Sequence, residues 1–175
     1  MSLIVKDSGA GDYTPCPEGV CQAVCADVQD LGEMENSFTG KMVRKLRIVW
    51  QTEHKHEKYD RPHEVSMSYT QSLHDKAGLR KLLEAWRGRK FTAAELAGFD
   101  VETLIGANCQ IQVMHRIGQD GRTWANVASI MPIGKGMTKM AVSDGFVRRK
   151  DRDGVKSMPA GAAVSPPGDE EEIPF

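Results

Sequence analysis

Residues 72–88 read SLHDKAGLRKLLEAWRG, and the interpretation of the fold depends on this stretch. Its apolar residues recur at the spacing of one helix face, which predicts an amphipathic helix. These residues are Leu79, Leu82, Leu83 and Trp86. Ser72 and Asp75 fit a capping box at the start of this helix, and Gly88 suits its end. Because the segments on both sides have the period of strands, the helix interrupts a sheet.

Three segments before this helix alternate apolar and polar residues, which is typical of β-strands. They span residues 20–31, 41–52 and 63–71, and a polar loop follows the first of them. The predicted core faces are Val20, Val24, Ala26 and Val28 in the first strand, Met42, Leu46, Ile48 and Trp50 in the second, and Val65, Met67 and Tyr69 in the third. The opposite faces are left for solvent or for a ligand.

Two further strands, at residues 108–117 and 122–133, are joined by the hairpin signal GQDG. Short helical turns precede them at 92–98 and 99–106. Their predicted caps are Thr92 with Glu95 for the first turn and Asp100 for the second. Three strands, a helix and two strands are the element order of the OB-fold, a five-stranded Greek-key barrel.

The sequence therefore predicts an all-β OB-fold domain with a helical insert over residues 20–150, after an irregular segment at 1–19. Beyond Pro132 the periodicity is lost, which leaves the structure of the last part of the domain open. From residue 151 onward Pro, Gly, Ala and Ser dominate. Such a composition cannot bury enough apolar area to offset chain entropy. We predict a flexible linker at 151–168 and a separate acidic tip at 169–175.

Charge is distributed unevenly along the chain. All 23 Lys and Arg lie at or before Lys156, whereas four of the 24 Asp and Glu lie at 169–172. A mildly basic body with an acidic end favours a polyanion as partner of the body and a basic surface as partner of the end. No apolar run approaches the roughly 18 residues of a membrane span, and the first residues lack a signal-peptide pattern. We expect a cytoplasmic protein without a membrane partner.

The four cysteines do not form a CxxC pair. They are Cys16, Cys21, Cys25 and Cys109. In a cytoplasmic protein this pattern favours reduced, mostly buried thiols. The alternative is a zinc site that borrows His54, His56 or His63.

The ending DEEEIPF, residues 169–175, resembles the C-terminal tip of bacterial single-stranded DNA-binding proteins, an acidic run that ends in Ile-Pro-Phe. Glu stands here where that family usually has Asp. The body resembles single-stranded DNA-binding proteins carried by bacteriophages over about residues 20–133, in the segments AVCADVQDLG, KLRIVW, LLEAWRGRKFTAAELAGFD and LIGANCQIQV. The resemblance implies a DNA-coating protein in a bacterial host cytoplasm, with replication, recombination and repair enzymes as partners of the tip.

The residues of the tip suit protein recruitment without reference to any family. They are Asp169, Glu170, Glu171, Glu172, Ile173, Pro174 and Phe175. Ile173 and Phe175 can fill an apolar pocket, and Pro174 lowers the entropy lost when they are fixed. The terminal carboxylate can accept from Arg or Lys, and the acids would speed encounter with a basic surface. A merely solubilising tail would explain the acids but not the apolar end. We further hypothesise that the acidic tip occupies the empty DNA groove.

Single strands are bound by a basic groove with aromatic faces, and an OB-fold places its ligand on the second and third strands and the adjoining loops. On that face the second strand offers Lys41, Lys45 and Arg47, and the third offers Ser66 and Ser68. The rim loops add Phe38, Arg116, Arg122 and Trp124, and Trp50 is a further candidate. An ordinary solvated face is the alternative for the cations.

The aromatic residues divide between the core and the DNA face. Trp50 and Tyr69 share faces with apolar residues, which favours core packing for both, and Trp86 is predicted to cover one end of the barrel. Trp124 lies opposite Val127 in the strand alternation, which favours stacking. The loop at 54–63 could bind DNA through its cations and Tyr59, or it could be a charge-balanced hairpin tip.

Catalysis has little support in the sequence. The acids are dispersed, and no P-loop, G-x-S-x-G or H-E-x-x-H motif is present. We therefore expect a protein that is not an enzyme, needs no cofactor or metal, and coats single-stranded DNA, either as a monomer or as a homo-oligomer. Two alternatives stay open: an adaptor whose tail mimics that of the host protein, and a mediator that anneals complementary strands.

Overall fold

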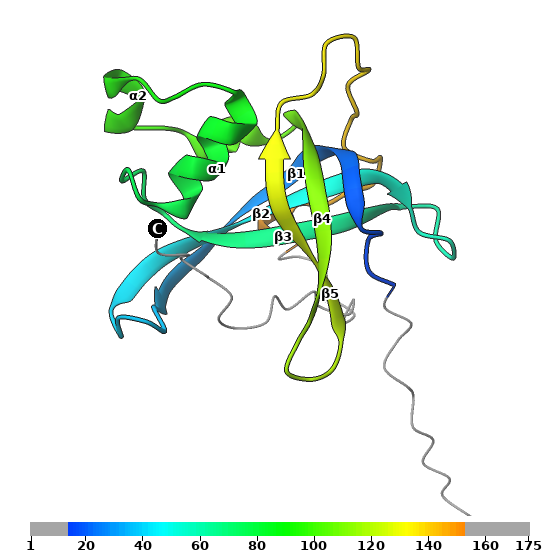
Figure 1. The fold of residues 1–175 in the computed structure, drawn as a ribbon, viewed down its shortest axis with the longest axis horizontal. Helices are drawn as coiled ribbons and strands as arrows, with labels where there is room; N and C mark the ends of the chain where they lie inside the picture. Colours follow the sequence, from blue (N-terminus) through cyan, green and yellow to red (C-terminus); the bar gives the residue numbers. More distant parts are fainter. Residues whose placement is uncertain (1–13, 153–175) are drawn as a thin grey trace, which may run out of the picture.

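The computed structural model describes residues 14–152, which form a strongly curved five-stranded sheet with helices at one end (Figure 1). The strands are β1 (Gly19–Glu35), β2 (Met42–Lys55), β3 (Pro62–Thr70), β4 (Asn108–Ile117) and β5 (Thr123–Met131). The helical elements are α1 (Gly78–Arg87), α2 (Ala93–Ala97) and the short 3-10 turns η1 (Val101–Leu104) and η2 (Arg149–Asp151). No helix within residues 14–152 is long and apolar enough to span a membrane.

Every strand pair is antiparallel, and the strands lie in the order β3-β2-β1-β4-β5. The prediction of an all-β domain with a helical insert is confirmed at this level, and the sheet is OB-like. β5 also lies close to β3. A closed barrel would need a hydrogen-bonded ladder between these two edge strands, and the described sheet has none. The closed Greek-key barrel therefore stays a prediction.

The core lies between the inner face of the sheet and α1. The predicted helical stripe is confirmed, because Leu79, Leu82, Leu83 and Trp86 are all buried. The ring centroids of Trp86 and Trp50 are 5.9 Å apart, and the Trp86 indole N–H donates to the Asn108 carbonyl over 3.0 Å. A large aromatic pair thus joins α1 to the sheet, and the covering of a barrel end by Trp86 stays a prediction together with the closed barrel.

The predicted core face of the first strand is partly wrong: Val24, Ala26 and Val28 are buried as expected, but of these three only Val28 belongs to the main core cluster. Cys21, Ala23 and Cys25 enter the core cluster, whereas Val20 is 59% exposed. A β-bulge interrupts the β1–β2 register between Cys25 and Asp27. The extra residue reverses the alternation, so Val28 returns to the core. The small residues before the bulge were mistaken for the outer face because cysteine and alanine carry a weaker apolar signal than valine.

Three boundaries also differ from the prediction. β1 continues to Glu35, which shortens the β1–β2 loop, and β2 continues to Lys55, which shortens the β2–β3 loop. α1 begins only at Gly78, with Ala77 as a cap that makes no side-chain bond. The Ser72–Asp75 capping box is therefore wrong: Ser72 accepts from the His74 N–H instead, and Asp75 pairs with His74. The predicted Gly88 end, the Thr92–Glu95 capping box and the Asp100 cap are confirmed.

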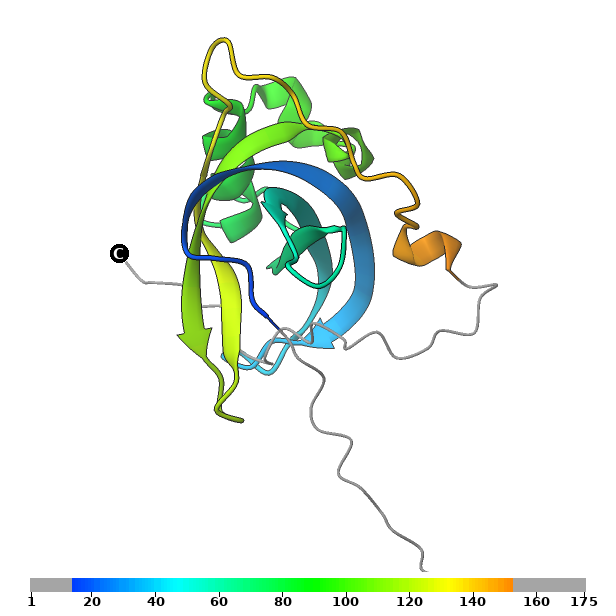
Figure 2. The ribbon, with the colours of Figure 1, turned by 90° about the vertical axis from the view of Figure 1, so that its right-hand side faces the viewer.

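Residues 134–152, here called the strap, cross the outside of the curved sheet (Figure 2, yellow to orange). They contain little regular structure, yet hydrogen bonds fix them along β1 and its neighbours. Gln22 donates to the Thr138 carbonyl over 2.7 Å. Gln51 and Ser143 bond twice, over 2.8 and 3.0 Å. The strap explains why Asp27 and Gln51 are buried although they face away from the core.

Candidate nucleic-acid interface

The outer face of β2 and β3 brings cations and small hydroxyl groups together. In the β2–β3 register Lys45 lies opposite Thr70, Arg47 opposite Ser68, and Val49 opposite Ser66. The Arg47 Nε donates to the Ser68 Oγ over 3.4 Å. The strand alternation brings Lys45, Arg47, Ser66 and Ser68 to one surface, as the sequence predicts. Because the hydroxyl side chains are short, a ligand backbone can approach this surface closely.

The β1–β2 hairpin presents Phe38 beside this face. Phe38 is 68% exposed, and the Asn36 side chain shapes the tip by accepting from the Phe38 and Thr39 N–H groups. Lys41 is exposed where the chain enters β2, and its carbonyl accepts from the Asn36 N–H. An aromatic ring and a cation thus project together from a hairpin whose backbone is held by its own turn.

The β4–β5 hairpin carries the other predicted rim residues. Trp124 lies opposite Arg116 in the register, and Arg122 pairs with Asp120 at 3.6 Å. A Cβ at Gly118 would come within 2.8 Å of the Trp124 Nε1, so the indole lies against the bare Gly118 backbone. Both this hairpin and the β1–β2 hairpin project on the lower side of the sheet in Figure 1.

The strap is anchored beside this face by Asp27 and Arg148. Asp27 is 1% exposed and accepts from the Arg148 Nε over 2.8 Å and from the Arg149 N–H over 2.9 Å. The Arg148 guanidinium also forms a bidentate pair with Glu102, over 2.7 and 2.9 Å. Burial disfavours the charged form of Asp27, but the bonds from Arg149, Arg148 and Gln29 outweigh it and lower its pKa.

The anchored strap places a second arginine next to Arg47. Gln29 lies opposite Arg47 in the β1–β2 register, and the Arg149 Nη1 donates to the Gln29 Oε1 over 3.5 Å. Burial and the charge of Arg149 both lower the pKa of Arg47. Arg149 was not among the residues singled out from the sequence. The run RRK at 148–150 is its only signal there, and nothing in that run indicates which sheet residue it approaches.

The other end of the same face is acidic or neutral. The Gln51 amide donates to Glu64 over 3.3 Å, and Glu53 accepts from the Gln22 N–H over 2.8 Å. Val49 separates these groups from Arg47 along β2. An anionic ligand is therefore favoured at the Lys45 and Arg47 end of the sheet rather than along its full length.

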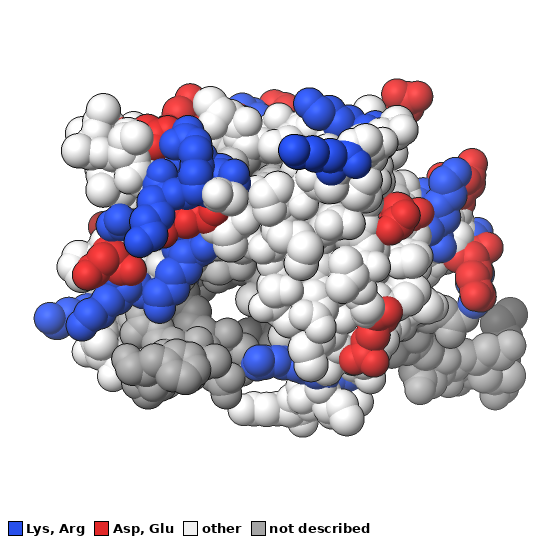
Figure 3. All heavy atoms as spheres, turned by 45° about the horizontal axis from the view of Figure 1, so that its top comes forward, with Lys and Arg blue, Asp and Glu red and all other residues white. Residues whose placement is uncertain are grey.

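The arginines Arg80, Arg87 and Arg89 of the helical end are paired with carboxylates. Figure 3 shows Lys and Arg gathered at the left, the side on which α1 and α2 lie, with Asp and Glu interleaved. Arg80 pairs with Glu84 at 3.0 Å, and both Arg87 and Arg89 pair with Glu95. The Arg89 and Arg87 bonds, with the Thr92 N–H, hold the pKa of Glu95 well below its ordinary value. These ion pairs suit helix stability better than phosphate binding.

Two aromatic residues belong to the core. Trp50 is 0% exposed, so it cannot stack on a base, and its inclusion among the DNA-contact candidates is wrong. Its place on the same face as Leu46 and Ile48 decides this. Tyr69 packs against the same cluster, and burial raises its pKa. Core packing, which the sequence favours for both residues, is what the structure shows.

The β2–β3 tip is a compact hairpin with partial charge balance. Lys55 pairs with Asp60 at 3.2 Å, and the Arg61 guanidinium lies 5.1 Å from the Tyr59 ring centroid. The rings of His56 and His63 stack at 4.3 Å. In Figure 1 this tip projects to the right, away from the other two hairpins.

The cysteines are free and buried in the described structure, as predicted. A hydrogen bond from Cys21 lowers the pKa of Cys16 to about 7 and raises that of Cys21. Among residues 14–152, no three His, Cys, Asp or Glu side chains gather as a metal-binding group. The zinc alternative therefore finds no ligand set in that part of the chain.

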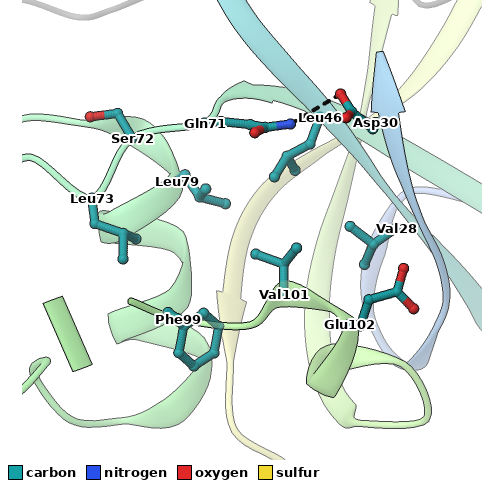
Figure 4. Close-up of a pocket in the computed structure, with 10 residues that line it drawn as sticks. All are labelled: Val28, Asp30, Leu46, Gln71, Ser72, Leu73, Leu79, Phe99, Val101 and Glu102. Atoms are coloured by element: carbon teal, nitrogen blue, oxygen red, sulfur yellow. Dashed lines mark hydrogen bonds between the residues drawn. The ribbon is translucent and has the colours of Figure 1, made fainter. Parts of the chain in front are cut away.

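A pocket of about 360 Å³ lies at the end of the sheet near α1 (Figure 4). Its apolar lining is Val28, Leu46, Leu73, Leu79, Phe99 and Val101. Its two carboxylates are already paired, Asp30 with Arg44 and with the Gln71 amide, and Glu102 with Arg148. These pairs leave the pocket an apolar hollow with a satisfied polar rim, which is poorly suited to acid–base chemistry.

No protein-family model and no curated protein matches this chain. The tip at 169–175 and the linker at 151–168, apart from its first two residues, lie outside the described residues. The candidate interface therefore consists of the outer face of β2 and β3, its two flanking hairpins and the strap.

Proposed function

We propose that this protein binds single-stranded DNA, coats it without strong sequence preference, and recruits other proteins through its acidic tip. One observation carries the proposal: Lys45 and Arg47 share an outer sheet face with Ser66 and Ser68, beside hairpins that bear Phe38 and Trp124. Cations for the backbone and aromatic rings for the bases are the two components that single-strand binding requires. The order of the strands supports a closed OB barrel as the scaffold.

The role that we propose for each residue follows from its chemistry. Lys41, Lys45, Arg47 and the hairpin arginines Arg116 and Arg122 neutralise phosphates, which gives salt-dependent affinity. Phe38 and Trp124 stack on bases, and stacking tolerates any base because every base has a π-face. Phosphate contacts and stacking carry no direct sequence information, so we propose little sequence preference. No catalytic step is part of this function.

The acidic tip provides the second part of the proposed function, the recruitment of other proteins. Ile173 and Phe175 would enter an apolar pocket on a partner, and the adjoining glutamates would meet a basic surface around it. The partners we propose are enzymes of replication, recombination or repair, brought to DNA that the body has coated. A bacteriophage origin and a bacterial host cytoplasm accompany this proposal.

The test is fluorescence anisotropy of labelled oligo-dT with the full chain across a salt series. We expect tight binding that weakens with salt, with a log–log slope of about −0.7 per phosphate contact. Unlabelled duplex of equal length should compete poorly, because paired bases offer no exposed faces for stacking.

The alternatives predict different results in the same assay. Absence of salt-sensitive binding would overturn DNA coating and favour the adaptor, which acts through its tail alone. Accelerated pairing of complementary strands, beyond what coating allows, would indicate the annealing mediator.

A further inference from the structure

We propose that Arg149 of the strap and Arg47 of β2 together hold one phosphate group of single-stranded DNA, so that the strap forms a wall of the interface. This inference rests on the proposed function. It adds to that function a residue that sequence reasoning did not find, and a specific geometry for one phosphate.

The strap is held at this position by groups other than the Arg149 side chain. The Arg149 backbone N–H donates to the Asp27 Oδ2 over 2.9 Å. Its neighbour Arg148 lies between two carboxylates, at 2.8 Å from Asp27 and 2.7 Å from Glu102. Because anchoring uses the Arg149 backbone and the Arg148 side chain, the exposed Arg149 guanidinium is not needed to hold the strap.

A line of polar groups connects the two guanidinium groups across three strands. Arg149 donates to Gln29 of β1 over 3.5 Å, Gln29 lies opposite Arg47 in the register, and Arg47 donates to Ser68 of β3 over 3.4 Å. The strap and β2 therefore present their cations over the same patch of sheet. Gln29 and Ser68 supply neutral polar groups on either side of Arg47.

The pair of like charges is suited to an anion. Arg47 is partly buried, and both its burial and the charge of Arg149 lower its pKa. Among the ion pairs between described residues, none includes Arg47 or Arg149. A phosphate between them would replace repulsion with two attractions, and the planar guanidinium matches phosphate oxygens in a bidentate manner. Arg148, one residue earlier, is saturated by carboxylates and serves as the anchor.

The experiment is a double-mutant cycle in the full chain, read by oligo-dT anisotropy across a salt series. Arg47→Ala and Arg149→Ala should each weaken binding about tenfold at low salt, as expected for a charged hydrogen bond. The double variant should lose little more than either single variant, because both residues hold the same phosphate. The log–log salt slope should fall by about 0.7 in all three variants.

Two further variants control for charge and folding. Lys81→Ala removes an exposed cation of α1, away from the interface, and should leave affinity unchanged. Arg149→Lys should recover part of the affinity, since it keeps the charge but not the bidentate geometry. Arg149→Ala should melt at the same temperature as the parent chain, because within residues 14–152 the Arg149 side chain makes only the long bond to Gln29.

The outcomes separate this inference from the proposed function. If the parent chain binds and Arg149→Ala behaves like Lys81→Ala, the phosphate site is wrong and DNA coating stands. Losses that multiply, with a slope reduced by about 1.4 in the double variant, would assign the two arginines to different phosphates and overturn the pairing. Failure of Arg149→Lys to recover any affinity at equal melting temperature would also overturn it. If the parent chain shows no salt-sensitive binding, the proposed function itself fails.

Discussion

At the scale of single residues, the position of Trp124 on the β4–β5 hairpin suits its indole to stack on a base. Its indole lies against the Gly118 backbone and opposite Arg116, on the face away from Val127. Trp124→Ala should therefore weaken oligo-dT binding about tenfold, because one stacked base contributes roughly 1–3 kcal/mol. Anisotropy at fixed salt measures this change.

Tyr59 provides the matched comparison for Trp124. It is 52% exposed on the β2–β3 tip, which projects away from the other hairpins. Tyr59→Ala should leave affinity unchanged. The reverse pattern, a loss with Tyr59→Ala and none with Trp124→Ala, would move the DNA path to the other end of the sheet and revive the alternative in which residues 54–63 bind DNA.

Asp27 and Asp30 show how burial changes the role of one residue type. Both lie on β1 and pair with an arginine at 2.8 Å, but Asp27 is buried and Asp30 is exposed. Asp27→Asn should lower the free energy of unfolding by about 2–4 kcal/mol, because it leaves Arg148 with less compensation in a partly buried position. Asp30→Asn should change it little. Urea unfolding measures both, and equal effects would show that the Asp27 pair does not anchor the strap.

At the scale of elements, the strap should respond to acid through the same carboxylate. The pKa of Asp27 is lowered from its ordinary value of 3.8, and the pKa of Glu102 is lowered as well. A carboxyl group with a lowered pKa in the folded state stabilises the fold above its unfolded-state pKa. That stability is lost as pH falls through the folded-state value. The parent chain should therefore lose stability below about pH 4.

The Asp27→Asn variant tests this assignment of the acid sensitivity. It should lose less stability than the parent chain between pH 5 and pH 2, because it has no Asp27 carboxylate to protonate. Thermal unfolding across a pH series gives the comparison. Parallel curves for the two proteins would assign the acid sensitivity to other carboxyl groups.

The elements themselves differ in how far sequence alone predicts them. The α1 stripe and the inner faces of β2 and β3 follow from local period, and the structure agrees except at Met42, which is 61% exposed at the start of β2. The inner face of β1 does not follow from local period, because a bulge after Cys25 reverses the alternation. The residue pattern gives no signal of this bulge. The strap is harder still: its structure depends on hydrogen bonds between residues about 90 to 120 positions apart, such as Ser143 with Gln51 and Arg149 with Asp27. No local period records such partners.

The same distinction holds for the candidate interface. Lys45, Arg47, Ser66 and Ser68 were predictable because alternation places them on one side of two paired strands. Arg149 was not, because only the docked strap brings it to Gln29. Trp50 shows the opposite error: an aromatic residue near the predicted face was kept as a candidate although its own alternation with Ile48 assigned it to the core.

At the scale of the whole molecule, the mildly basic body and the acidic end of the chain carry opposite charges. An acidic segment tethered to the body competes with DNA for the same cations, and salt screens this competition. We predict that a full-length chain with Glu170→Gln, Glu171→Gln and Glu172→Gln binds oligo-dT more tightly than the parent chain at low salt. The difference should shrink as salt rises.

A second full-length variant separates charge from the apolar end of the tip. Ile173→Ala with Phe175→Ala keeps every acid, so it should bind DNA like the parent chain but lose capture of partner proteins. The affinities of the parent chain and both variants for oligo-dT are measured by anisotropy at two salt concentrations. If the glutamine variant binds no more tightly, the acids do not compete with DNA. If the alanine variant binds more tightly instead, an apolar contact rather than charge occupies the groove, and the Lys45 and Arg47 end of the sheet would not be where the tip acts.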